Sequence, residues 1–167
     1  MRIIGLTGGI GMGKSTAAAM LRRMRVPVFD ADRAAHDLIA PGGAGERAVA
    51  RAFPRSLAGG EIDRRLLGRI VFEDRAALDR LEAILHPLIL RAEAEYLKRA
   101  RRGRWPLVAL DIPLLYETGA ERRVDLVAGH ENSPQAASAS AKVLWQHDVA
   151  LHAAAFKAAG VNPFAEL

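Results

Sequence analysis

The chain has 167 residues, half of them hydrophobic, no cysteine and a formal net charge of +5. This length predicts one compact core carrying a lid or a helical insertion. The lack of cysteine excludes disulfides, thiolate metal sites and cysteine nucleophiles, and it fits a cytoplasmic protein. No apolar run approaches about 18 residues, so we expect neither a secretory signal nor a membrane span.

The first predicted elements are a strand at residues 3–6 and a helix over about residues 15–24, joined by a glycine-rich segment. Residues 8–15 of this segment fit the pattern G-x-x-x-x-G-K-[ST] of a phosphate-binding loop. Glycine lets the backbone turn with positive φ and bring N–H groups close to phosphate oxygens. The helix N-terminus adds partial positive charge. The alternative is a glycine-rich turn that only joins a strand to a helix.

The polar residues of this loop have distinct expected roles toward ATP. Lys14 bridges the outer phosphates and is a predicted catalytic residue, the Ser15 hydroxyl coordinates Mg²⁺, and Thr16 lies near the inner phosphates. The predicted nucleotide site consists of Gly9, Ile10, Gly11, Met12, Gly13, Lys14, Ser15 and Thr16.

A second short strand is predicted at residues 26–29, followed by helices over 33–39 and 45–53. The alternation of strand, helix and strand argues for a parallel sheet, whose ligands bind at the carboxyl ends of the strands. Asp32 lies just beyond such an end and suits a general base that takes a proton from an acceptor hydroxyl. Asp30 is expected to play a structural or capping part. The alternative for Asp32 is a helix cap or a solvated turn.

The middle of the chain, about residues 61–103, is predicted to be helical. Asp74 can cap a helix that runs toward Arg102, and Pro87 predicts a kink or a fresh helix start. Basic residues crowd into residues 98–104, where the C-terminal end of a helix favours cations. Because no aromatic residue interleaves with them to stack bases, we favour this interpretation over nucleic-acid binding.

A third strand at 107–110 delivers Asp111 to its end, and a fourth begins at about 125. Asp111 is the predicted second magnesium residue, acting through water, although a cap or a turn is an equal alternative. Together these elements predict an α/β fold: a P-loop NTPase-like parallel sheet flanked by helices, with a helical acceptor-binding region.

Five motifs of this chain occur in the order typical of dephospho-CoA kinase. They are residues 5–16, 30–32, 62–64, 81–87 and 111–117. This resemblance covers about residues 1–127 and implies transfer of the ATP γ-phosphate to the ribose 3′-hydroxyl of dephospho-CoA, the last step of coenzyme A synthesis. It implies that Asp32 lies at the acceptor hydroxyl. The acceptor side would be lined by Arg64, Arg65, His86, Pro113, Leu114 and Glu117, although His86 can equally be a helix-start residue.

The resemblance ends near Val127, and residues 128–167 are expected to form a divergent tail with a helix over about 143–159. The family usually continues with a lid helix pair that carries arginine, whereas no arginine follows Arg123 here. We hypothesise an altered reading frame or terminus after about Val127, which would preserve ATP binding and reduce transfer. An uncovered sheet edge would favour self-association, so we expect a monomer or a weak homo-oligomer. The alternatives are a catalytically impaired nucleotide-binding protein and another small-molecule kinase.

Overall fold

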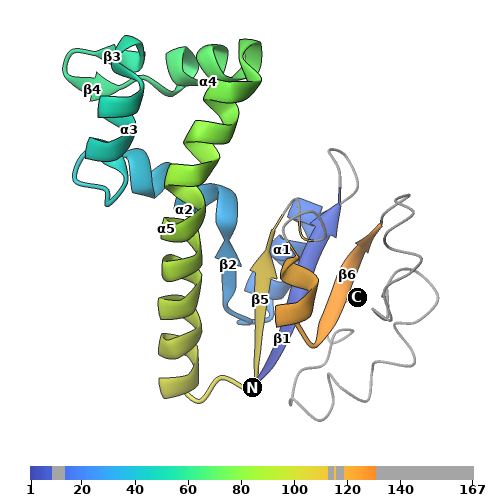
Figure 1. The fold of residues 1–167 in the computed structure, drawn as a ribbon. Helices are drawn as coiled ribbons and strands as arrows, with labels where there is room; N and C mark the ends of the chain where they lie inside the picture. The colour runs from blue at the N-terminus through green and yellow to red at the C-terminus, as the bar shows by residue number, and fades with distance from the viewer. Residues whose placement is uncertain (9–13, 113–114, 116–118, 131–167) are drawn as a thin grey trace. The chain divides into compact units, whose positions relative to one another are not determined.

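The computed structural model describes residues 1–8, 14–112, 115 and 119–130 (Figure 1). These residues fall into two compact units. The sheet unit comprises Met1–Asp30 and the chain from Leu97 onward, and the helical unit comprises Ala31–Tyr96. Several predicted features lie outside the described residues: Gly9, Ile10, Gly11, Met12, Gly13, Pro113, Leu114, Glu117 and the part of the predicted tail over residues 131–167.

The sheet unit is built on a four-stranded parallel sheet with the order β2-β5-β1-β6. The strands are β1 (Arg2–Gly8), β2 (Val28–Asp30), β5 (Leu107–Asp111) and β6 (Leu126–His130). This arrangement confirms the predicted parallel sheet. Consecutive strands β1 and β2 are not neighbours, because β5 lies between them with all five of its residues buried. A fully buried parallel strand is apolar throughout, as β5 is until its final aspartate.

Helix α1 (Lys14–Arg23) packs on this sheet through a narrow stripe of small and apolar side chains. Ala18 and Leu21, three positions apart, are buried and share a core cluster with Ile4 and Leu6 of β1. The helix ends where Arg25 adopts a left-handed φ of 59° and the Val26 N–H donates to the Leu21 carbonyl at 2.9 Å. The packing of α1 on the sheet therefore fixes the position of its first residue, Lys14. A short 3-10 helix, η2 (Ala120–Arg123), precedes β6.

Gly5 of β1 is required by close packing. A Cβ placed there would lie 2.5 Å from Leu115 Cδ1, and Leu115 is fully buried. Gly5→Ala is therefore expected to lower the free energy of unfolding by about 1–3 kcal/mol through overpacking. Gly68→Ala is the matched control, because a Cβ meets nothing within 4 Å at this helical position. There alanine should stabilise by about 0.5–1 kcal/mol. Urea denaturation of both variants tests the prediction. Equal changes of the same sign in the free energy of unfolding would contradict it.

The helical unit combines helices with a small hairpin. In chain order its elements are α2 (Ala31–Ile39), α3 (Glu46–Ala52), η1 (Pro54–Ser56), β3 (Leu57–Ala58), β4 (Glu61–Ile62), α4 (Arg64–Glu73) and most of α5 (Arg75–Arg102). Its core contains Ile39, Val49, Phe53, Leu67, Ala77 and Leu85. The hairpin was not predicted. Its turn is formed by Gly59 and Gly60, with φ of 62° and 88°, a conformation that glycine tolerates best.

Helix α2 begins two residues earlier than the sequence predicts. It starts at Ala31, so Asp32 lies in its first turn rather than in a loop before it. A carboxylate is favoured there because the helix N-terminus carries partial positive charge. The helix thus follows β2 without a connecting loop, and Ala31 alone separates Asp32 from the last residue of the strand.

Of the two alternatives predicted at Pro87, a kink or a fresh helix start, the fresh start is wrong. Helix α5 continues through this residue over 28 residues. Proline removes one backbone hydrogen bond, but Leu85 before it and Ile89 after it both pack against the core of the helical unit. Packing on both sides holds the helix together. Among the described residues, no helix has the combination of length and apolar character needed to cross a bilayer.

Candidate functional site

The carboxyl ends of all four parallel strands lie at one edge of the sheet. There β1 ends at Gly8, where the predicted phosphate loop begins, and β5 ends at Asp111. Asp111 lies in register with Leu6 on one side and with Asp30 on the other. The Ile112 N–H donates to the Leu6 carbonyl at 3.0 Å, which extends the pairing just past Asp111. The sheet therefore fixes the backbone position of this carboxylate.

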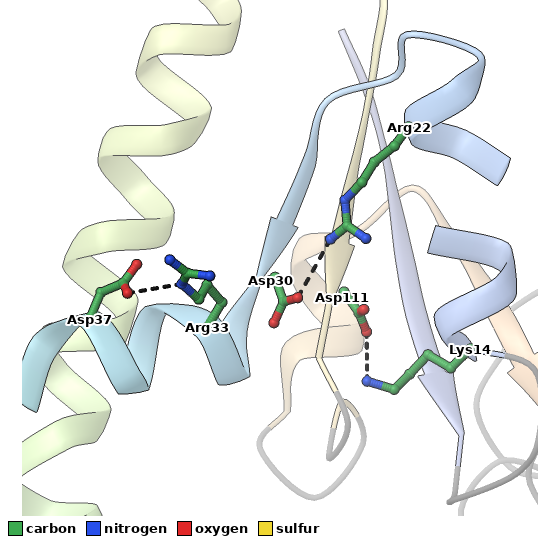
Figure 2. A network of polar contacts seen from close by, with 6 residues as sticks. All are labelled: Lys14, Arg22, Asp30, Arg33, Asp37 and Asp111. Atoms are coloured by element: carbon green, nitrogen blue, oxygen red, sulfur yellow. Dashed lines mark hydrogen bonds and ion pairs between the residues drawn. The ribbon is translucent and has the colours of Figure 1, made fainter. Parts of the chain in front are cut away.

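Lys14 and Asp111 form an ion pair at this edge. Lys14 Nζ lies 2.7 Å from Asp111 Oδ1, and the two side chains are 17% and 8% exposed (Figure 2). A charge-assisted hydrogen bond this short, with little water around it, is strong compared with a surface pair. The sequence predicts a role for each residue and misses their contact. The signal in the sequence for this contact was that Lys14 lies at the end of the loop motif and Asp111 at the end of a buried strand.

A second ion pair accompanies the neighbouring strand end. Arg22 Nη2 of α1 lies 3.5 Å from Asp30 Oδ2, and both side chains are more than a third exposed (Figure 2). Asp30 and Asp111 are register neighbours, so their carboxylates would repel each other without nearby cations. Helix α1 supplies a cation to each. This agrees with the structural part expected of Asp30.

The other loop residues within the described chain are Ser15 and Thr16, in the first turn of α1. Both are solvent-exposed. Ser15 follows Lys14 directly, so a hydroxyl and the Asp111 carboxylate belong to one end of the sheet, and both are oxygen donors of the kind that Mg²⁺ prefers. The described residues contain no cluster of three or more His, Asp or Glu that could hold a metal ion. These residues fit an ion that also takes ligands from phosphate and water.

The helical unit contains a cavity of about 690 Å³. Its polar lining comes from α2 and from the start of α4, and the remainder is chiefly apolar. The lining residues are Ala35, His36, Ile39, Ile62, Asp63, Arg64, Arg65, Leu67, Gly68, Val71, Leu81 and Leu85. The predicted acceptor residues Arg64 and Arg65 belong to this lining. A cavity lined by arginine and apolar side chains can take a ligand that carries both phosphate and apolar groups.

Helix α2 brings a residue to this cavity that the sequence did not single out. His36 Nε2 lies 2.7 Å from Arg64 Nη2. Asp32 is exposed and lies four residues before His36, so the two share one face of α2 with Ile39. That spacing of four was the signal in the sequence. His86, also predicted on the acceptor side, is exposed within α5 and is not among the residues that line the cavity.

Asp63 is the N-cap of α4 and sets the position of the two arginines. Its carboxylate accepts hydrogen bonds from the backbone N–H of Leu66 at 3.2 Å and of Arg65 at 2.7 Å. The bond from Leu66 has the larger effect and the bond from Arg65 the next, and together they hold the pKa of Asp63 below its ordinary value. The ionised form is thus favoured by the fold, as expected for a capping carboxylate.

Acidification is expected to remove the stability that Asp63 contributes. Because its folded pKa is lowered, this contribution is fully present above the unfolded pKa of about 3.9 and is lost as pH falls through the folded pKa. Asp63→Asn keeps a capping oxygen and cannot ionise. The difference in unfolding free energy between wild type and this variant should therefore shrink on acidification. Urea denaturation over a pH series measures it, with Asp79→Asn as an exposed control. A difference independent of pH would contradict the prediction.

Comparison with known proteins shows which family the chain resembles. The family model described as Dephospho-CoA kinase matches residues 2–137. A relative named Dephospho-CoA kinase from Paramagnetospirillum magneticum is 61% identical over 128 residues, covering 77% of this chain and 60% of the relative. Among solved structures, TT1252 from Thermus thermophilus has a TM-score of 0.68 and 44% identity, covering 77% of this chain and 64% of that one.

A solved dephospho-CoA kinase from Campylobacter jejuni has a TM-score of 0.62 and 26% identity, covering 77% of this chain and 66% of its own. These proteins share the parallel sheet with flanking helices, which confirms the predicted fold class. The chain spans less than two thirds of the length of the Paramagnetospirillum relative and of both solved structures. With a family model matched over most of its residues, the chain belongs to the dephospho-CoA kinase family.

Proposed function

We propose that this protein transfers the γ-phosphate of ATP to the ribose 3′-hydroxyl of dephospho-CoA. The observation that carries the proposal is the Lys14–Asp111 pair at the carboxyl edge of the sheet, directly after a phosphate-loop sequence. A cation and a carboxylate placed there suit the two tasks of a phosphoryl-transfer site, neutralising phosphate and supporting a metal ion. Membership of the family supports the identity of the acceptor.

The donor half of the site would work through α1 and β5. Lys14 is expected to exchange its bond to Asp111 for the outer phosphates, and the exposed first-turn hydroxyls of Ser15 and Thr16 would contact the phosphate chain and the metal. Bound Mg²⁺ would supply charge neutralisation between the phosphates. The Asp111 carboxylate, released from Lys14, would orient the water molecules of that ion. The residues Gly9 to Gly13 are proposed to contribute backbone N–H donors.

The acceptor half of the site is proposed to lie along α2 and α4. Asp32 would take the proton of the acceptor hydroxyl as the new P–O bond forms, and its exposure in the first turn of α2 leaves it open to a ligand. Arg64 and Arg65 would bind the phosphates of dephospho-CoA, beside the apolar lining of the cavity. His86, Pro113, Leu114 and Glu117 remain predicted contacts.

The sequence also predicts that the protein has no nucleic-acid partner, is cytoplasmic and is monomeric or weakly associated. We propose no nucleic-acid partner for the basic cluster, because Arg99, Arg101 and Arg102 occupy the last turn of α5, where the helix dipole favours cations. The cytoplasmic location and the monomeric or weakly associated state remain predictions from the sequence.

The proposed function is tested by incubating the protein with ATP, Mg²⁺ and dephospho-CoA and separating the products by chromatography. We expect ADP to form only when the acceptor is present, together with a product phosphorylated at the 3′-hydroxyl. Adenosine and pantothenate serve as alternative acceptors that each resemble one part of the substrate. Faster turnover of either would favour another small-molecule kinase. ATP binding without acceptor-dependent ADP would favour a nucleotide-binding protein that lacks transfer.

A further inference from the structure

We propose that His36 is a positioning residue: in its neutral form it orients Arg64 to bind a phosphate group of the acceptor. The observation is the 2.7 Å contact between His36 Nε2 and Arg64 Nη2, two residues that line the cavity. The inference rests on the proposed function, because dephospho-CoA is taken as the ligand. The contact between His36 and Arg64 does not depend on which ligand binds.

The chemistry of the contact fixes the state of the histidine. A guanidinium group has five N–H donors, no acceptor, and remains protonated in proteins. The imidazole nitrogen facing it must therefore accept the hydrogen bond. His36 consequently carries its proton on Nδ1 and has no charge in this pair, because an imidazolium offers a donor at both nitrogens.

The same bond prepares Arg64 for an anion. Each of the two hydrogens on Nη2 belongs to a different edge of the planar guanidinium, so the bond to His36 occupies one edge. The other edge keeps two parallel N–H groups, the arrangement that binds a phosphate through two hydrogen bonds. A long side chain held in one orientation also loses less conformational freedom when it binds.

The contact joins two elements that carry different parts of the proposed acceptor site. His36 lies one turn after Asp32 on α2, whose Ile39 is buried in the core of the helical unit. Arg64 is the first residue of α4, and that helix start is fixed by the Asp63 cap. Orientation of the phosphate-binding arginine is thus set from the helix that carries the proposed base. A substrate held at its phosphates would be placed relative to that helix.

Removal of the acceptor nitrogen is expected to weaken substrate binding without changing the chemical step. His36→Ala should raise the Kd and KM for dephospho-CoA by about tenfold, with kcat and the KM for ATP within about twofold of wild type, because one charge-assisted bond is lost. His36→Gln places an amide oxygen near the former Nε2 and should restore most of the affinity. Asp37→Asn is the matched control. It breaks only the exposed Arg33–Asp37 pair on the same helix and should leave all constants unchanged.

A double-mutant cycle with Arg64→Gln separates positioning from a general effect on folding. Arg64→Gln alone should weaken dephospho-CoA binding, and adding His36→Ala should then change the Kd by less than about twofold. Imidazole ¹⁵N signals should report a protonated Nδ1 and an unprotonated Nε2 for His36 in wild type, and this signature should change in Arg64→Gln. Thermal unfolding checks that each variant is folded.

Two results with the variants would overturn the inference: independent, multiplicative losses in the double mutant, or a folded His36→Gln protein as weak in binding as His36→Ala. Calorimetric titration with dephospho-CoA separates this inference from the proposed function. Binding without transfer would contradict the proposed function and leave the inference testable through Kd. Failure of wild type to bind dephospho-CoA would contradict the role of His36 as well.

Discussion

Lys14→Met is expected to lower acceptor-dependent ADP formation by at least about 100-fold, the effect typical of removing one donor aimed at a developing charge. It should also lower the free energy of unfolding by about 1–3 kcal/mol, because the carboxylate of Asp111, only 8% exposed, loses the ammonium group 2.7 Å away. Steady-state kinetics and urea denaturation measure the two effects. Turnover within threefold of wild type would show that Lys14 does not act on the donor phosphates.

The double variant Lys14→Met/Asp111→Leu separates these two effects. Replacing both members of a buried ion pair with apolar residues is often neutral or stabilising, since no uncompensated charge remains. Stability should therefore recover toward wild type while turnover stays lost. Arg22→Met is the control from the same helix: its pair with Asp30 is long and exposed, so the free energy of unfolding should change by less than about 1 kcal/mol. A double variant less stable than Lys14→Met would contradict this account.

Asp32→Asn is expected to lower kcat by about 10²–10⁴-fold, the usual contribution of a general base. The KM for ATP should remain near wild type, because Asp32 is assigned to the acceptor. Unfolding free energy should change by less than about 1 kcal/mol, since the side chain is exposed and loses only its favourable interaction with the helix N-terminus. Initial rates over a matrix of ATP and dephospho-CoA concentrations, together with thermal unfolding, measure these quantities.

Asp37→Asn is again the suitable control, because it removes an exposed carboxylate five residues farther along the same helix. An unchanged kcat with a raised KM for dephospho-CoA in Asp32→Asn would show that Asp32 binds the acceptor and does not take its proton. A full loss of kcat together with a loss of stability would assign it to the structure of α2.

The two aspartates differ in environment in a way that supports different roles. Asp111 is buried at a strand end and pairs with Lys14, a fixed environment that suits the proposed role beside the donor phosphates and a metal ion. Asp32 is exposed in the first turn of a helix. A base that meets a mobile substrate needs this access, whereas a residue that orients a metal's water molecules needs a fixed position.

The sequence by itself determined most of the local elements and the family. Glycine spacing in residues 8–15 predicted a phosphate loop, and short apolar runs located β1, β2, β5 and β6 to within about two residues. Parallel pairing followed from the alternation of strands and helices. These signals are local, because backbone preference and hydrophobic period act over a few neighbouring residues.

Only the tertiary structure decided which distant residues meet. The position of β5 between β1 and β2 brings Asp111 to Lys14, although 97 residues separate them in the chain. The contact between His36 and Arg64, and the cavity beside it, depend on how α2 and α4 pack around a shared core. Packing also carried α5 through Pro87 against its local preference. Strand order and helix packing are set by the burial of many side chains together, and no short stretch of sequence contains that information.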